Sequence, residues 1–192
     1  QLGCYWVSEY VMDWIANGRL AERIGDRHPW RAPQGCYPCT GEDRWCVISV
    51  GDDAEWAALC REMGEPELSR DPRFATQLGR REHHDELDVM ISSWTRGLDR
   101  FHVMERLQAA GVPAGPVYDA RDSNLDPNHW ERGFLEKVTF EEERQVGTRV
   151  IMGRPWRLSK TPISVRGPSP MLVHDNRNVL EGLLGVSSTK VD

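Results

Sequence analysis

The sequence predicts an α+β fold, in which a small helix-rich domain surrounds a short, mainly antiparallel sheet and is followed by an extended C-terminal tail and a terminal helix. Three observations predict this fold. Apolar residues recur at helical spacing in several segments. The stretch 45–50, WCVISV, is β-rich and nearly all apolar. Prolines recur through 153–170, and they keep that segment out of a central strand.

The composition is that of a globular chain. The 192 residues are 39% hydrophobic and 28% charged, and the chain is long enough to bury a core. The net charge of −6 argues against general binding of nucleic acid. No apolar run approaches the ~20 residues of a membrane helix, so we expect no membrane span. The five cysteines do not form a disulfide framework, which favours a reducing, cytoplasmic location.

Two of the cysteines, Cys36 and Cys39, have C-x-x-C spacing. A zinc site would need two further ligands at suitable spacing, and the sequence offers no second pair of this kind. A thioredoxin-like motif would open a helix after a strand, whereas this pair precedes the strand at 45–50. We therefore expect neither a metal site nor a redox site.

The first predicted element is a helix over 4–16, because its apolar residues share one face. These residues are Val7, Val11, Trp14 and Ile15. Asn17-Gly18 then supplies a stop signal.

A loop over 25–44 follows, and it is both stiff and cationic. Its potential cations are Arg27, His28 and Arg31. Pro29 and Pro33 each fix φ and remove a backbone donor, and Trp30 adds a flat apolar face. Such a loop beside a buried strand suits an anionic ligand. The alternative is a surface loop whose arginines are only solvated, since most loops are simply connections.

A second helix begins after the strand. Asp52 and Glu55 resemble a capping box, and Gly64 ends the helix. Its predicted inward face consists of Trp56, Leu59, Cys60 and Met63.

Two further helices are predicted over 79–96 and, after a cap at Asp99, over 100–110. His83 and His84 lie near the start of the first of these. Adjacent residues on a helix point about 100° apart and do not chelate together. We therefore expect both to be surface histidines.

Residues 111–117, GVPAGPV, combine two glycines with two prolines and so specify a fixed backbone path. The segment either lines a cleft or forms a rigid joint between a helix and a short strand. The backbone effects of glycine and proline favour the joint. The remaining predicted elements are short helices near Asp119 and Asp126, strands over 134–140 and 148–152, and a terminal helix over 174–184.

No short catalytic motif is present: the chain has no GxSxG, P-loop, GxGxxG or HExxH. An ordered set of longer pieces is informative instead. The pieces are N-G-R at 17–19, G-x-R-H-P-x-x-A-P-x-G-x-Y-x-C at 25–39, W-x-x-I-x-V at 45–50, W-A-A-L-C at 56–60, D-P-R-F at 71–74, L-Q-A-A-G-V-P-A-G-P-V at 107–117 and R-G-F at 132–134. In this order they resemble the class III CoA-transferase (CaiB/BaiF) family, which includes formyl-CoA and carnitine CoA-transferases.

The resemblance implies that this chain is the C-terminal part of an enzyme about twice its length. It implies a connecting helix at 1–24, a small α+β domain at 25–152 and a tail at 153–192 that returns to a large domain. The N-terminal half would carry the main CoA contacts and the aspartate that forms an acyl anhydride and then a CoA thioester. No catalytic residue is then expected in this chain, which alone would be inactive. The family also implies an interlocked homodimer at full length.

The expected reaction moves CoA between an acyl-CoA and a carboxylic acid, with the CoA thioester as substrate and no bound cofactor. Positions 29–32 correspond to a glycine-rich loop in the formyl-CoA branch, from which this sequence departs. Guanidinium groups there suit a carboxylate or the CoA phosphates. The resemblance thus implies a substrate-binding set: Arg27, His28, Trp30, Arg31 and Ala32. Two alternatives stay open, an α-methylacyl-CoA racemase or isomerase of the same fold and a non-catalytic module that binds a partner.

Overall fold

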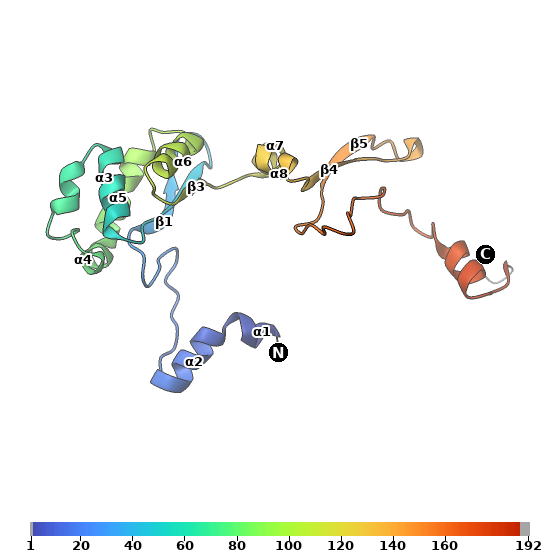
Figure 1. Ribbon diagram of the computed structural model, residues 1–192, viewed down its shortest axis with the longest axis horizontal. Helices are drawn as coiled ribbons and strands as arrows, with labels where there is room; N and C mark the ends of the chain where they lie inside the picture. The colour runs from blue at the N-terminus through green and yellow to red at the C-terminus, as the bar shows by residue number, and fades with distance from the viewer. Residues whose placement is uncertain (1, 189–192) are drawn as a thin grey trace. The chain divides into compact units, whose positions relative to one another are not determined.

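The computed structural model describes residues 2–188, and its α-helices and most of its strands are labelled in Figure 1. The chain divides into two compact units, Gln1–Val117 and Tyr118–Asp192. These two compact units are not the same as the domains expected at 1–24, 25–152 and 153–192. The expected domain boundaries describe a full-length enzyme, and they remain a prediction. Among the described residues, no helix combines the length and the apolar character that crossing a membrane requires.

Helices and short antiparallel strands make up both units, which confirms the α+β fold class. The first unit contains α1 (Leu2–Trp6), α2 (Ser8–Asn17), β1 (Gln34–Pro38), β2 (Trp45–Ser49), α3 (Asp53–Met63), the 3-10 helix η1 (Pro66–Arg70), α4 (Gln77–Glu82), α5 (His84–Thr95), α6 (Arg100–Ala109) and β3 (Ala114–Pro116). The second contains α7 (Ala120–Leu125), α8 (Pro127–Glu131), β4 (Leu135–Thr139), the 3-10 turn η2 (Glu142–Arg144), β5 (Thr148–Met152) and the π-helix η3 (Asn178–Leu183).

The sheet of the first unit has the order β1-β2-β3, and both pairings are antiparallel. Tyr37 lies opposite Cys46, and Ile48 lies opposite Ala114. Because side chains alternate across a strand, Tyr37, Cys46 and Ile48 face the core, whereas Trp45 and Val47 are exposed on the other face. Helix α5 packs against β1, and α6 packs against β2 and β3.

The core of the first unit lies between this sheet and the helices. Its fully buried side chains include Val50, Trp56, Leu59, Cys60, Phe74, Leu87, Ile91, Val103 and Leu107. The inward face predicted for the second helix is therefore confirmed at three of its four positions, and Met63 packs against the cluster while partly exposed.

The predicted caps of α3 and α6 are confirmed, but the α3 cap is not a reciprocal capping box, because the Glu55 carboxylate accepts from the Gly51 N–H and not from that of Asp52. The carboxylate of Asp52 accepts a hydrogen bond from the Glu55 N–H, and that of Asp99 accepts from Phe101 and His102. Gly64 ends α3 in the left-handed conformation with φ +83°, which a residue without Cβ adopts at least cost.

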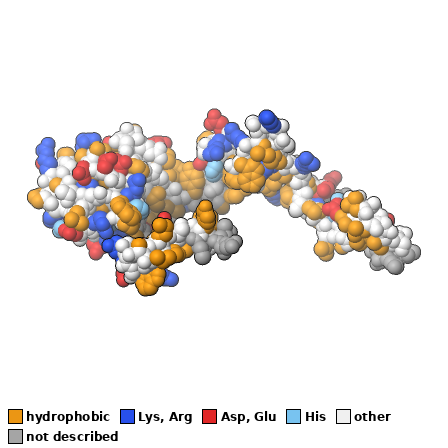
Figure 2. All heavy atoms as spheres, turned by 60° about the horizontal axis from the view of Figure 1, so that its bottom comes forward, with side chains coloured by type: hydrophobic (Ala, Val, Ile, Leu, Met, Phe, Trp, Pro, Cys, Tyr) orange, Lys and Arg blue, Asp and Glu red, His pale blue; other side chains and the backbone are white. Residues whose placement is uncertain are grey.

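Two predicted helices are interrupted. The helix expected over 79–96 is split into α4 and α5, because His83 has φ −107° and ψ 26° and so leaves the helical region. The helix expected over 4–16 is likewise divided at Val7, with φ −120° and ψ 20°. Its predicted inward face is exposed within the described residues, since Trp14 is 56% and Ile15 76% accessible. Exposed apolar side chains are coloured orange in Figure 2.

The segment 111–117 itself contains the short strand, β3, rather than only leading into it. It is joined to β2 at both ends: the Ser49 N–H donates to the Pro113 carbonyl at 3.0 Å, and the Val117 N–H donates to the Trp45 carbonyl at 2.9 Å.

In the second unit, β4 and β5 form the predicted antiparallel pair, with Leu135 opposite Met152. Leu135 and Val138 are its buried residues. Phe134 is half-buried and packs edge-on against His129, with ring centroids 5.3 Å apart. The segment 153–170 contains neither helix nor strand, as its prolines predict.

Candidate functional site

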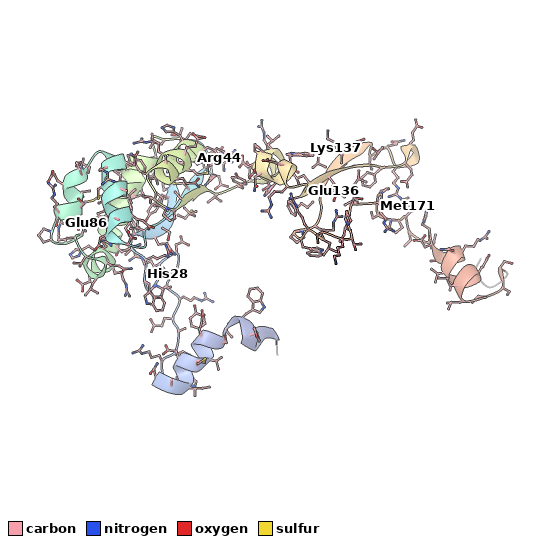
Figure 3. The ribbon with its side chains drawn as sticks, viewed as in Figure 1. His28, Arg44, Glu86, Glu136, Lys137 and Met171 are labelled. Carbon is pink, nitrogen blue, oxygen red and sulfur yellow. The ribbon has the colours of Figure 1, made fainter. Side chains whose placement is uncertain are left out.

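The cationic loop has a defined path at the end of the sheet, where His28 marks it in Figure 3. The Trp30 N–H donates to Nδ1 of His28 at 3.1 Å, and His28 forms an isolated antiparallel bridge with Arg31. The Ala32 N–H donates to the Val50 carbonyl at 3.1 Å. This turn leaves the Trp30 side chain 72% exposed. The loop is thus ordered by its own backbone and presents an indole to solvent.

Helix α5 holds the loop through an acidic side chain, Asp88. A guanidinium nitrogen of Arg27 lies 3.0 Å from one carboxylate oxygen of Asp88 and also contacts Asp85. The hydroxyl of Tyr37 donates to the other oxygen of Asp88 at 3.0 Å. Burial and the neighbouring Asp88 carboxylate raise the pKa of Tyr37, so this hydroxyl stays protonated as a donor. Arg27 is therefore neutralised by carboxylates in the described structure.

The prediction that His83 and His84 lie on the surface is wrong for His84. Its side chain is only 3% accessible, and Nε2 accepts a hydrogen bond from the Gln34 N–H at 3.0 Å. Its Nδ1 lies 3.4 Å from Oδ2 of Asp88. His83 is half-buried and packs edge-on against Phe74, with centroids 6.0 Å apart. A ring nitrogen can satisfy a backbone N–H inside the protein, and this is why His84 is buried.

Burial opposes the ionisation of Asp88, but its interactions with His84, Tyr37 and Arg27 outweigh burial and hold its pKa below the usual value. A carboxyl group whose pKa is lowered by folding stabilises the protein above its unfolded pKa of about 3.9, and this stabilisation is lost as the pH falls through the folded pKa.

Replacement of Asp88 by asparagine is expected to lower the free energy of unfolding by about 1–2 kcal/mol at pH 7, because bonds with Tyr37 and Arg27 are weakened and partial exposure screens the charges. The difference from the wild type should shrink as the pH falls below about 4. Urea unfolding at a series of pH values measures this difference. Asp85→Asn is the control, since that side chain is 93% exposed and should change stability little. A pH-independent difference at Asp88 would contradict the assignment.

Arg80, which the sequence did not single out, ties helix α4 to the same loop. Its guanidinium is fully buried and donates to the Ala32 carbonyl at 2.8 Å and to the Phe74 carbonyl at 3.0 Å. A third bond reaches Oδ1 of Asp53 at 2.8 Å. No local spacing distinguishes Arg80 from Arg81, so nothing in the sequence could have identified it.

Two pockets adjoin the loop. The smaller, of about 270 Å³, is lined by Ile24, Arg27, His28, Pro29, Arg31, Arg81 and His84. The larger, of about 510 Å³, is lined by Gly25, Asp26, Arg27, Gln34, Gly35, Cys36, Val47, Ile48, Ser49, Pro113, Ala114 and Gly115. Pro113, Ala114 and Gly115 thus line this pocket, and the segment 111–117 to which they belong follows α6 and contains β3; a role of this pocket in the enzyme's cleft stays a prediction.

The expected substrate-binding residues occupy different positions around these pockets. Arg27, His28 and Arg31 line the smaller pocket together, whereas Trp30 projects from the turn. Ala32 is fully buried and reaches its surroundings through its backbone. Within residues 2–188, neither Arg31 nor Arg81 forms an ion pair, and Nη1 of Arg31 lies 3.4 Å from Oγ of Ser49. The pocket can therefore offer positive charge to an anion.

The cysteines near the sheet have properties of structural thiols. Burial raises the pKa of Cys36, Cys39 and Cys46, and it raises the pKa of Cys60 to about 12. Protonated thiols are poor nucleophiles and poor metal ligands. In the part of the chain that the structure describes, no group of three His, Cys, Asp or Glu side chains is arranged to hold a metal ion.

Comparison with protein families matches residues 2–176 to CoA-transferase family III. Two similar curated proteins are the succinyl-CoA–D-citramalate CoA-transferase of Chloroflexus aurantiacus, 33% identical over 92% of this chain and 43% of that protein, and the succinate–glutarate CoA-transferase of Agrobacterium fabrum, 31% identical over 93% of this chain and 43% of that protein. A solved CaiB/BaiF family protein from Brucella suis superposes with a TM-score of 0.75 at 25% identity, over 97% of this chain and 44% of that one. The chain thus spans less than half the length of these relatives.

Proposed function

This chain belongs to CoA-transferase family III, and from that premise we propose that it acts as the C-terminal part of an enzyme that moves CoA from an acyl-CoA to a carboxylic acid. The reactive carboxylate, which forms an anhydride and then a thioester, would lie in an N-terminal half. The 192 residues alone are then expected to be inactive. The CoA thioester is a substrate in this scheme, and the enzyme needs no bound cofactor.

The observation that carries the proposal is the ordered cationic loop beside a pocket of about 270 Å³. Arg31 and Arg81 offer guanidinium groups without an ion-pair partner among the described residues, and a guanidinium matches the two oxygens of a carboxylate. The two relatives are named for succinyl-CoA, citramalate, succinate and glutarate. A dicarboxylic acid would leave its second carboxylate for this loop while the first reacts.

The proposal also includes the partners and the location expected of the whole enzyme. The N-terminal half would contact this chain, and two copies would interlock as a homodimer in the cytoplasm. The relatives reported above are named as CoA-transferases, so we give the transferase reaction precedence over racemisation and over a purely binding role. Deuterium exchange at the acyl α-carbon, without transfer of CoA, would instead indicate the racemase.

Replacement of Arg31 by alanine in the protein expressed from its complete reading frame is expected to lower kcat/KM for the carboxylic acid at least about tenfold, which corresponds to about 1.4 kcal/mol of lost transition-state binding. Steady-state assays with each substrate varied in turn measure the effect. Arg23→Ala is the matched control, because Arg23 is an exposed arginine of the same segment outside the pocket lining. Unchanged turnover and unchanged apparent affinity for both substrates would remove Arg31 from the site.

A further inference from the structure

We propose that Arg80 is a positioning residue, which fixes the backbone of the loop so that Arg31 meets the substrate in one conformation. The inference rests on the proposed function for its catalytic consequence. Its structural part stands independently, on three hydrogen bonds of one buried guanidinium.

The arrangement of Arg80 links three segments that are remote in sequence. The side chain is 0% accessible and donates to the loop at Ala32, to the turn before α4 at Phe74 and to the start of α3 at Asp53. Its guanidinium also lies over the Trp56 ring, 5.7 Å from the centroid. The planar fork of an arginine can satisfy all these acceptors at once, whereas a lysine ammonium on a flexible stem cannot hold the same directions.

Stability alone does not account for this charge. Among the residues that the structure describes, its carboxylate partner is Asp53, which is 69% exposed, so solvent screens the ion pair from that side. Buried ion pairs often stabilise a protein no more than apolar side chains of similar volume. The guanidinium instead fixes the path of the main chain, because two of its hydrogen bonds are accepted by backbone carbonyls.

The bond to Ala32 acts directly on Arg31, which precedes it in the chain. The peptide of Ala32 is held from both sides: its N–H donates to Val50 and its carbonyl accepts from Arg80. Helix α5 holds the flanking positions, through Asp88 on Arg27 and His84 on Gln34. With these positions fixed, the Cα of Arg31 has a single location beside the pocket.

The test uses the protein expressed from its complete reading frame, with Arg80→Lys and Arg80→Gln. In the variants we expect amide hydrogens of residues 27–34 to exchange at least about tenfold faster, and KM for the carboxylic acid to rise about tenfold with a smaller change in kcat. Hydrogen exchange by mass spectrometry and steady-state kinetics give these two readouts. Asp53→Asn is the matched control, because it alters the same guanidinium while leaving the bond to Ala32. Both readouts should stay within about twofold for this control.

A double-mutant cycle with Arg31→Ala distinguishes a specific effect of Arg80 on the position of Arg31 from a general loss of rigidity in the protein. If Arg80 acts through Arg31, Arg80→Lys should have little further effect on KM in an Arg31→Ala background. Additive effects would overturn the proposal, as would unchanged exchange at residues 27–34. If neither Arg80 variant folds by circular dichroism, Arg80 serves folding and the proposal is likewise overturned. If the wild type transfers no CoA, the proposed function fails, and the exchange rates alone decide whether Arg80 positions the loop.

Discussion

Replacement of Trp56 by alanine is expected to lower the free energy of unfolding by about 3–5 kcal/mol, because it opens a large cavity in the core of the first unit. The indole is 1% accessible and packs edge-on against Phe74, with centroids 6.3 Å apart. It also forms the surface over which the Arg80 guanidinium lies. Trp56→Ala therefore removes apolar contacts from the core, and it also removes the ring that packs against the buried Arg80 guanidinium. Chemical denaturation followed by circular dichroism measures the loss.

Two variants test whether this loss comes from the cavity. Trp45→Ala removes the same type of side chain from the exposed face of the sheet, where 37% of the residue is accessible, and should cost much less. Trp56→Phe keeps most of the volume and removes an indole N–H that has no hydrogen-bond partner among the described residues, so it should also be mild. Equal losses for Trp45→Ala and Trp56→Ala would contradict the cavity explanation.

Replacement of Gly79 by alanine is expected to destabilise the protein by about 1–3 kcal/mol, although it lies within helix α4. In an open helix, alanine is favoured over glycine by about 1 kcal/mol. Here the added Cβ would lie 2.4 Å from the Arg73 carbonyl oxygen and 3.3 Å from Oγ1 of the cap Thr76. The backbone must shift to admit it. Denaturant unfolding measures the change in the free energy of unfolding. Its sign is informative, because helix propensity alone predicts stabilisation whereas the steric contact predicts destabilisation.

Gly97→Ala provides the comparison, since nothing among the described residues lies within 4 Å of the position that its new methyl group would take. We expect the free energy of unfolding to change by no more than about 0.5 kcal/mol in this variant. A stabilised Gly79→Ala variant would show that the turn at Arg73 relaxes freely, and it would remove the steric account of this glycine.

Local rules account for what the sequence predicted correctly. The apolar face of α3, its cap at Asp52 and its stop at Gly64 depend on residues within one or two turns of each other. The pairing of β4 with β5 depends on two neighbouring segments and the turn between them. Such features are visible in the spacing of residue types, and they survive folding because tertiary contacts reinforce them.

The parts that could not be predicted depend on partners far away in the chain. His84 is buried because it meets the backbone of Gln34, 50 residues earlier, and Arg80 because it meets Ala32, 48 residues earlier. Arg27 was predicted as a ligand cation, and it is held by Asp88, 61 residues later. No local sequence pattern predicts these long-range contacts. The cationic loop was therefore foreseen as a segment, whereas the side chains that hold it were not, and its role in binding substrate stays a prediction.

The two outer strands of the three-stranded sheet both carry proline: Pro38 in β1 and Pro116 in β3. A proline offers no N–H to an incoming strand, and its ring obstructs close approach. Recruitment of a strand from another molecule, the first step of amyloid-like growth, is thus hindered at both outer strands of the sheet. Concentrated solutions of this protein should resist that route of aggregation even though the sheet is small and Trp45 and Val47 lie exposed on one of its faces.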